Sequence, residues 1–165
     1  MFVLGVDPGL SRCGYCVIEV GSRHQARAVA LGVMRTDPSR AVPERLAELW
    51  DDFRLLLDEH PTAEVALERV LFQVNVRTAM GVGQACGVVM AEAARRGLAV
   101  VEYSPNQVKD AVAGDGSADK EQVQRMVQIL LDLPSPPDPP DAADAAAVAL
   151  THAAHSSARR TEVPT

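Results

Sequence analysis

The sequence has little cysteine and no long apolar run. Three cysteines among 165 residues are typical of a protein kept reduced, and we expect a cytoplasmic location. Cys13 and Cys16 are three residues apart, but there is no second pair with which they would complete a zinc site. No apolar stretch approaches the roughly 20 residues of a membrane span. The N-terminus also lacks the basic and long apolar regions of a signal peptide, so we expect none.

Basic residues are also scarce. Lysine and arginine number 16 against 22 acidic residues, which gives a formal charge of −6. This balance argues against an obvious nucleic-acid-binding protein. However, the only two lysines, Lys109 and Lys120, flank one loop. Two divalent cations held by four acids would cancel four negative charges and leave −6 + 4 = −2, so net charge does not decide the question.

The first fifteen residues organise the chain. Residues 2–6 form an apolar run typical of a short strand buried on both faces, and Asp7 stands at its end. Pro8 and Gly9 turn the chain, and a second apolar run at 15–18 predicts a hairpin in the centre of a sheet. An acid at the tip of a central strand suits chemistry better than packing. The alternative is an aspartate that caps its own turn.

The remaining apolar patterns predict a single α/β domain. Strands are expected at residues 26–36, 64–70 and 98–103, and helices at 43–59, 75–96, from 105, from 119, and from 141 to about 154. The helix between the fourth and fifth strands makes a right-handed crossover with parallel strands. We therefore predict a mixed five-stranded sheet of order 3-2-1-4-5, flanked by helices, over residues 1–155. Residues 156–165 are expected to form a flexible tail.

The predicted helix over residues 75–96 is rich in small residues. Gly81, Gly83, Ala85 and Gly87 leave a thin, smooth surface on it. Glycine destabilises a helix by up to about 1 kcal/mol relative to alanine, and close approach of another backbone is the usual compensation. That backbone could belong to the protein's own sheet or to a second subunit. We favour a homodimer interface.

Four acids stand where elements begin or end: Asp7, Glu68, Asp141 and Asp144. Asp141 and Asp144 share one helical face, although acids at a helix start also act as caps. In the predicted sheet the four carboxylates meet at one edge, where they would repel one another without cations. Hard oxygen ligands suit Mg²⁺ or Mn²⁺. Two such ions roughly 3.5–4 Å apart support phosphodiester hydrolysis.

Five segments together resemble the RuvC family of bacterial Holliday-junction resolvases. They are GVDPGLSRCGY, ALERV, GVGQACG, YSPNQVKDAVAGDGSADKEQV and DAADA, which occur in the family's order within residues 1–155. The resemblance implies a ribonuclease-H-like fold and a homodimer that nicks four-way DNA junctions in pairs with the help of metal ions. It also implies the branch-migration proteins RuvA and RuvB as partners.

The resemblance also assigns roles to residues. Asp7, Glu68, Asp141 and Asp144 match the catalytic acids, which would hold two Mg²⁺ or Mn²⁺ ions per subunit. Lys109 and Lys120 match basic residues close to the DNA, and Ser117 lies in the loop between them. We expect Lys109 to be nearer the carboxylates and to act in cleavage.

Two departures from the family pattern concern DNA contacts. Relatives often carry a phenylalanine three residues after the catalytic glutamate that is thought to wedge into the junction. Here that position is Leu71, with Phe72 beside it, so either could be the wedge. Because the chain is acidic, its affinity for DNA would rest on few basic residues, and Arg69 and Arg77 join the lysines as candidates.

Three alternative functions fit part of the pattern. A related nuclease of the same fold that trims ribosomal RNA precursors shares the DPG turn and the acids. Sugar-kinase-like or actin-like ATPases also place aspartate after a first strand, but they need a second domain for which this chain is too short. A DNA-binding module without catalytic activity would have no need for all four acids.

Overall fold

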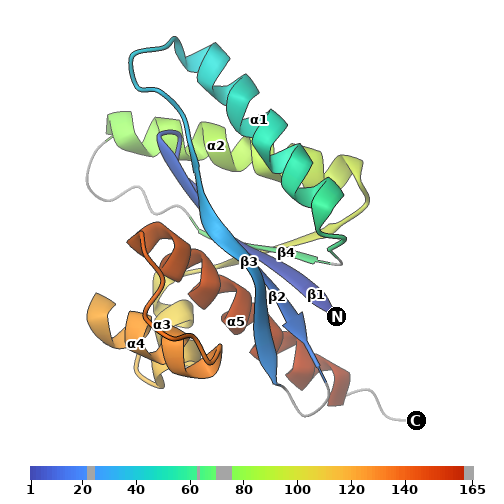
Figure 1. The fold of residues 1–165 in the computed structure, drawn as a ribbon, viewed down its shortest axis with the longest axis vertical. Coiled ribbons are helices and arrows are strands. Elements are labelled where there is room, and N and C mark those ends of the chain that lie inside the picture. Colours follow the sequence, from blue (N-terminus) through green and yellow to red (C-terminus); the bar gives the residue numbers. More distant parts are fainter. Residues whose placement is uncertain (22–24, 63, 70–75, 162–165) are drawn as a thin grey trace.

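The computed structural model describes residues 1–21, 25–62, 64–69 and 76–161, with side chains described except at 76–78 and 157–161. Within them, a central sheet lies between two groups of helices (Figure 1). The sheet strands are β1 (Phe2–Asp7), β2 (Arg12–Val20), β3 (Ala26–Arg35), β4 (Glu64–Glu68) and β5 (Ala99–Tyr103).

The sheet has the predicted order, β3-β2-β1-β4-β5. The first three strands form an antiparallel meander, whereas β4 pairs in parallel with both β1 and β5. Central strand β1 is buried on both faces, because Val3, Leu4 and Val6 are fully enclosed. The carboxyl ends of β1 and β4 therefore meet near the middle of one sheet edge.

Helices cover both faces of the sheet (Figure 1). One face packs on α1 (Val42–Glu59) and α2 (Val76–Arg95), and its core includes Leu49, Phe53 and Val89. The other face packs on α3 (Pro105–Ala113), α4 (Lys120–Leu130) and α5 (Pro140–Thr161). Cys13 belongs to the first core and Cys16 to the second, because alternate residues of a strand face opposite sides.

Local sequence explains where the short helices begin. Ser104 and Asp119 cap α3 and α4, and each forms a reciprocal capping box with a glutamine three residues later. Gly114 ends α3 in the left-handed conformation, with φ at 72°, which glycine adopts without steric cost. These signals fix the loop between Lys109 and Lys120.

The last helix is longer than predicted. It continues to Thr161, so the expected end near Ala154 is wrong. A tertiary contact accounts for part of the extension, since the Ser156 hydroxyl bonds to the ring of His152 at 3.0 Å and donates to Glu64 at 3.4 Å. The boundary of the domain at residue 155, with a flexible tail after it, stays a prediction.

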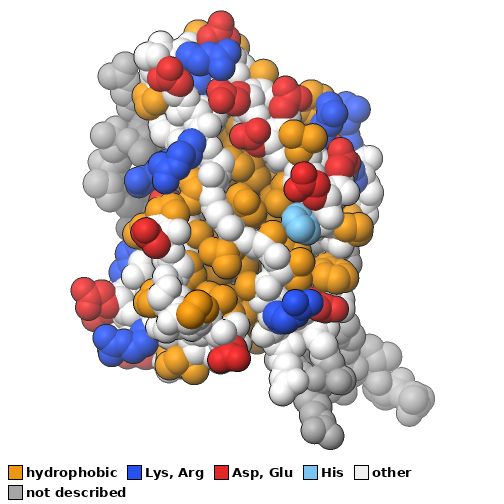
Figure 2. All heavy atoms as spheres, in the orientation of Figure 1, with side chains coloured by type: hydrophobic (Ala, Val, Ile, Leu, Met, Phe, Trp, Pro, Cys, Tyr) orange, Lys and Arg blue, Asp and Glu red, His pale blue; other side chains and the backbone are white. Residues whose placement is uncertain are grey.

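Strand β3 closes one edge of the sheet and pairs with β2. Apolar side chains gather across the middle of the face that Figure 2 shows, where β3 lies, while charged side chains surround them on the outer helices. Val29 of β3 is 37% exposed. Strand β2 separates this apolar edge from β1, so it lies apart from the carboxyl ends of β1 and β4.

Helix α5 lies directly on the backbone of β1 and β2. A Cβ atom added to Gly5 would collide with the carbonyl oxygen of Ala145, and one added to Gly14 would collide with that of Asp141. Only glycine allows this approach. The first turn of α5 is therefore held against the sheet next to the end of β1.

We predict that Gly5→Ala destabilises the protein by about 1–3 kcal/mol, as overpacking of a core typically does. The new methyl group would have to displace the backbone nitrogen of Ala149, 2.6 Å away, rather than a flexible side chain. Urea unfolding measures the change. Gly21→Ala is the control, because among the described residues its Cβ would meet only the Gln25 carbonyl oxygen at 3.7 Å, an ordinary contact. Equal stability of the two variants would contradict the close approach of α5.

Candidate active site

Two acids stand side by side at the sheet edge. Val6 of β1 pairs with Leu67 of β4, so the next residues, Asp7 and Glu68, end neighbouring parallel strands. Asp7 is also the register partner of Gly14, on which the carbonyl of Asp141 rests. Asp144 follows one turn later in α5. The structure thus brings the four predicted acids to one end of the sheet.

Burial and mutual repulsion act on these acids. Burial, and after it the charges of Asp144, Glu68 and Asp141 in that order, together raise the pKa of Asp7 from 3.8 to about 7, while the charge of Lys120 opposes the rise. Burial and the charge of Asp144 also raise the pKa of Glu68, against the lysine charges. The carboxylates of the site therefore repel one another when they are ionised, and this repulsion favours the binding of a cation.

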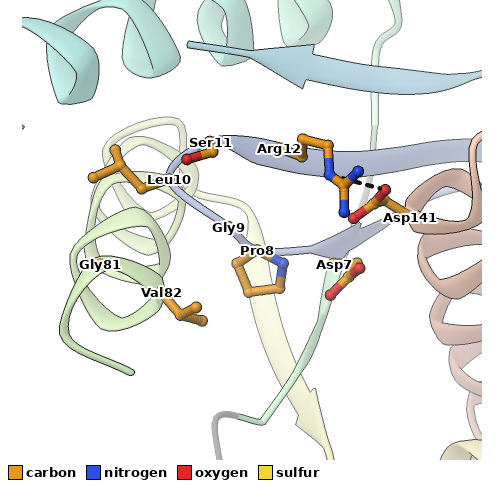
Figure 3. A pocket seen from close by; sticks show the side chains of 9 residues that line it. All are labelled: Asp7, Pro8, Gly9, Leu10, Ser11, Arg12, Gly81, Val82 and Asp141. Atoms are coloured by element: carbon orange, nitrogen blue, oxygen red, sulfur yellow. Dashed lines mark ion pairs between the residues drawn. The ribbon is translucent and has the colours of Figure 1, made fainter. Parts of the chain in front are cut away.

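Basic side chains partly neutralise two of the acids. Lys120 Nζ lies 2.7 Å from Asp144 Oδ2, and Arg12 Nε lies 3.4 Å from Asp141 Oδ2 (Figure 3). Desolvation lowers the pKa of Lys120, but the hydrogen bond to Asp144 and the surrounding acids outweigh it and raise this pKa overall. Arg12 was missed from the sequence, because its neighbour Asp141 is remote along the chain.

The donor set fits hard divalent cations in its chemistry, since all four side chains offer carboxylate oxygens. Among the described residues, no group of three or more Asp, Glu, His or Cys side chains is gathered tightly enough to hold an ion as it stands. The ion pairs give a reason, because Asp141 and Asp144 each face a basic side chain. Metal binding would require these two acids to exchange their partners.

Two pockets flank the acids. One, of about 430 Å³, has Asp7, Ser11, Arg12, Gly81 and Asp141 in its wall (Figure 3). The other, of about 330 Å³, is lined by Glu68, Lys109, Lys120, Val123 and Asp144. Each pocket thus combines two acids with at least one basic residue. A phosphodiester chain crossing the sheet edge would meet both.

Both predicted lysines reach the site, but their order differs from the prediction. Lys120 makes the direct ion pair with an acid, whereas Lys109 is half-buried in the same pocket wall and acts on Glu68 through its charge. Our expectation that Lys109 lies nearer the carboxylates is therefore wrong. The reason is that α4 packs against α5, which brings its first residue, Lys120, over Asp144.

The other predicted DNA contacts are only partly placed. Ser117 is exposed, but its hydroxyl donates to Asp115 at 2.7 Å, which ties the loop to itself. Arg69 is exposed directly after Glu68, and its backbone N–H donates to Tyr103. The side chain of Arg77, and both wedge candidates Leu71 and Phe72, lie outside the described residues.

Comparison with known proteins reveals close relatives. The family model for crossover junction endodeoxyribonuclease RuvC matches residues 3–152. This chain belongs to the RuvC family. It is 48% identical to a crossover junction endodeoxyribonuclease RuvC of Pseudarthrobacter chlorophenolicus, over 92% of this chain and 79% of the relative. A relative of the same description from Paenarthrobacter aurescens is 49% identical, over 92% and 80%.

Solved structures agree with RuvC membership. T. thermophilus RuvC in complex with a Holliday junction substrate superposes with a TM-score of 0.90 at 37% identity, over 94% of each chain. The yeast mitochondrial Holliday junction resolvase Ydc2 has a TM-score of 0.67 at 15% identity, over 96% of this chain and 83% of that one, and shows the fold alone. The RuvC family is generally metal-dependent, which agrees with the carboxylate donor set.

No helix in the described ranges is both long and apolar enough to cross a membrane.

We predict that Asp7→Asn stabilises the metal-free protein above neutral pH. The folded state holds the Asp7 proton with a pKa of about 7, against 3.8 ordinarily, so stability falls as pH rises between these values. At about pH 8 the variant should gain at most about 4 kcal/mol, since one pKa unit corresponds to about 1.4 kcal/mol. Urea unfolding with EDTA at several pH values measures this gain.

The control for this measurement is Asp37→Asn. Hydrogen bonds from Ser39 lower the pKa of Asp37, which makes its contribution to stability present at neutral pH and lost on acidification. This variant should therefore lose stability where Asp7→Asn gains it. Added Mg²⁺ or Mn²⁺ should stabilise the wild type more than Asp7→Asn and so reduce the difference between their free energies of unfolding. A wild type with no loss of stability between about pH 5 and 8 would contradict the prediction.

Proposed function

We propose that the chain resolves four-way DNA junctions by paired, symmetric, metal-dependent nicks during recombination and repair. As a RuvC family member it is a crossover junction endodeoxyribonuclease. The observation that carries the mechanism is the meeting of Asp7, Glu68, Asp141 and Asp144 at one sheet edge. Neighbouring acids help to raise the pKa of Asp7 and of Glu68, and a cluster of carboxylates of this kind is suited to cations and phosphate.

In the proposed mechanism these four acids hold two Mg²⁺ or Mn²⁺ ions per subunit. Such ions, when bound, would supply activation of a water molecule and stabilisation of the leaving oxygen of the phosphodiester. The chain's own contribution is a rigid donor set, because two acids end sheet strands and two lie on a helix packed on that sheet. Asp144 and Asp141 give up Lys120 and Arg12 when they become ligands.

We propose that the basic side chains contact DNA once the acids have exchanged them for metal ions. Lys120, released from Asp144, is placed to neutralise a backbone phosphate as a point charge. Lys109 shares its pocket with Glu68, from where it assists cleavage and contacts DNA. We assign further DNA contacts to Arg69, Arg77 and Ser117. Leu71 or Phe72 acts as the junction wedge.

We further propose a homodimer with α2 in its interface. A Cβ at Gly81 would touch Leu10 of the same chain at 3.6 Å, but Cβ atoms at Gly83 or Gly87 would meet none of the described residues within 4 Å. Their smooth surface is therefore open to a second subunit, and a two-fold dimer offers two equal sites to two opposed strands. The location is cytoplasmic, and the partners are RuvA and RuvB.

We predict that Asp7→Asn, Glu68→Gln and Asp144→Asn each lower junction cleavage by orders of magnitude. Each removes a proposed metal ligand without removing bulk, so junction binding without metal should persist or tighten as negative charge is lost. Single-turnover cleavage and gel-shift binding separate the two effects. Asp37→Asn, which removes an exposed acid at a different place, is the control. Parallel loss of binding and cleavage would indicate a different role for the acids.

Substrate choice tests the function itself. The wild type is incubated with Mg²⁺ or Mn²⁺ and a four-way DNA junction, a linear duplex or structured RNA. The proposal expects two symmetric nicks in the junction and little cleavage of the duplex. The alternative, a ribonuclease-H-like nuclease that processes ribosomal RNA precursors, expects cleavage of the RNA instead.

We predict that Gly83→Leu and Gly87→Leu convert the dimer into monomers. Leucine would fill the open surface and separate two closely packed helices. Analytical ultracentrifugation measures the mass, and circular dichroism confirms that each variant is folded. Ile129→Leu, an exposed apolar position on α4, is the control and should remain dimeric. Unchanged dimers in both glycine variants would move the interface elsewhere.

A further inference from the structure

The pocket beside Asp7 contains more than acids. The turn between β1 and β2 forms one wall, and Ser11 and Arg12 lie at its end (Figure 3). The side chain of Arg12 is 57% exposed although it pairs with Asp141 at 3.4 Å. A basic group with this much exposure can reach a ligand in the pocket. The distance from Arg12 to Asp141 is long for a charged hydrogen bond, so Arg12 can exchange this partner for another.

Behind this turn lies a buried arginine. Arg45 of α1 is only 8% exposed, yet it makes no ion pair within the part of the chain that the structure describes. Its Nε donates to the Thr36 hydroxyl at 2.9 Å, and its terminal nitrogen donates to the Ser11 hydroxyl at 2.6 Å. Its charge helps to lower the pKa of Asp37, which is exposed. Because hydroxyl groups are neutral, they do not cancel the charge of the buried arginine, and a positive potential remains around it.

The two hydroxyls differ in where their protons go. The Thr36 hydroxyl donates to the Leu10 carbonyl at 2.5 Å, which also fixes the turn. The Ser11 hydroxyl accepts from Arg45, and none of the described residues accepts a hydrogen bond from it. A serine hydroxyl has one proton to donate. Ser11 lines the pocket, so this proton is available to an acceptor there.

We propose that this pocket binds a DNA backbone phosphate next to the scissile one. Ser11 donates a hydrogen bond to it, Arg12 supplies the opposite charge, and Arg45 is the positioning residue that orients Ser11. The assignment rests on the proposed function, in which Asp7 and Asp141 on the same wall face metal ions. If Asp141 became a metal ligand, Arg12 would be released to the phosphate, so metal binding and DNA binding would be coupled.

The first test is the salt dependence of junction binding without metal. Neutralising one phosphate contributes about −0.9 to the slope of log affinity against log salt. Arg12→Gln should therefore flatten the slope of a dimer by roughly 2 in an Asp141→Asn background, where Arg12 is free, and by a smaller amount in the wild type. Asp141→Asn frees Arg12 and should steepen the slope, but should have no such effect in an Arg12→Gln background. Arg27→Gln is the matched control, because Arg27 is an exposed arginine paired with Glu19 at 2.8 Å. Equal slopes for Arg12→Gln and Arg27→Gln would overturn the proposal.

The second test locates the phosphate. Neutral methylphosphonates replace the phosphates around the nick one at a time, and single-turnover cleavage is measured with metal. One substitution should slow the wild type roughly tenfold, since it removes about 1.4 kcal/mol of interaction. That same substitution should have much less effect on Ser11→Ala and Arg12→Gln. If both variants keep the wild-type pattern at every position, the pocket does not bind DNA.

A third test asks whether Arg45 orients Ser11 or only stabilises the fold. Arg45→Lys keeps the charge and should retain the sensitive methylphosphonate position, whereas Arg45→Gln should lose it. Thermal unfolding checks that each variant is folded. If Arg45→Gln is unfolded, Ser11→Ala tests whether the hydroxyl that Arg45 orients contacts the phosphate. Failure of the proposed function is distinguishable, because the wild type itself would then leave the junction uncut.

Discussion

The site depends on the contact between the backbone of α5 and the two central strands. Gly5 and Gly14 have no side chains to hold the helix away, so the carbonyls of Ala145 and Asp141 rest on β1 and β2. This contact sets the height of the first turn of α5 above the sheet. Because Asp141 and Asp144 are on that turn and Asp7 ends the strand beneath it, one packing contact determines how the acids meet.

A buried polar cluster fixes the other half of the same helix. His152 of α5 is 1% exposed, and its Nδ1 lies 2.9 Å from the Tyr103 hydroxyl while its Nε2 pairs with Glu64. Tyr103 ends β5 and is the register partner of Glu68, and Glu64 begins β4. Satisfied buried polar groups specify a unique arrangement. Helix α5 is thus tied to the strand that carries Glu68 and to the two central strands under its first turn.

Electrostatics connects this rigid frame to DNA. Burial and the charges of neighbouring acids raise the pKa of Asp7 and of Glu68, and ion pairs with Lys120 and Arg12 relieve part of the repulsion. The same cations are suited to phosphate once the acids ligate metal. A chain of net charge −6 can therefore present positive side chains to DNA at this site once its acids bind metal. The buried charge of Arg45 adds to this effect on the Asp7 side of the site.

Local sequence patterns were enough to predict the strand order, the positions of Asp7 and Glu68 at strand ends, and the starts of most helices. These features follow from local signals, namely apolar runs, turn residues and caps. Three features became apparent from the folded chain alone: Lys120 rather than Lys109 pairs with an acid, Arg12 reaches Asp141, and α5 continues to Thr161. Arg45 and Ser11 are 34 residues apart. Such contacts depend on how helices pack on the sheet, which residue spacing along the chain does not encode.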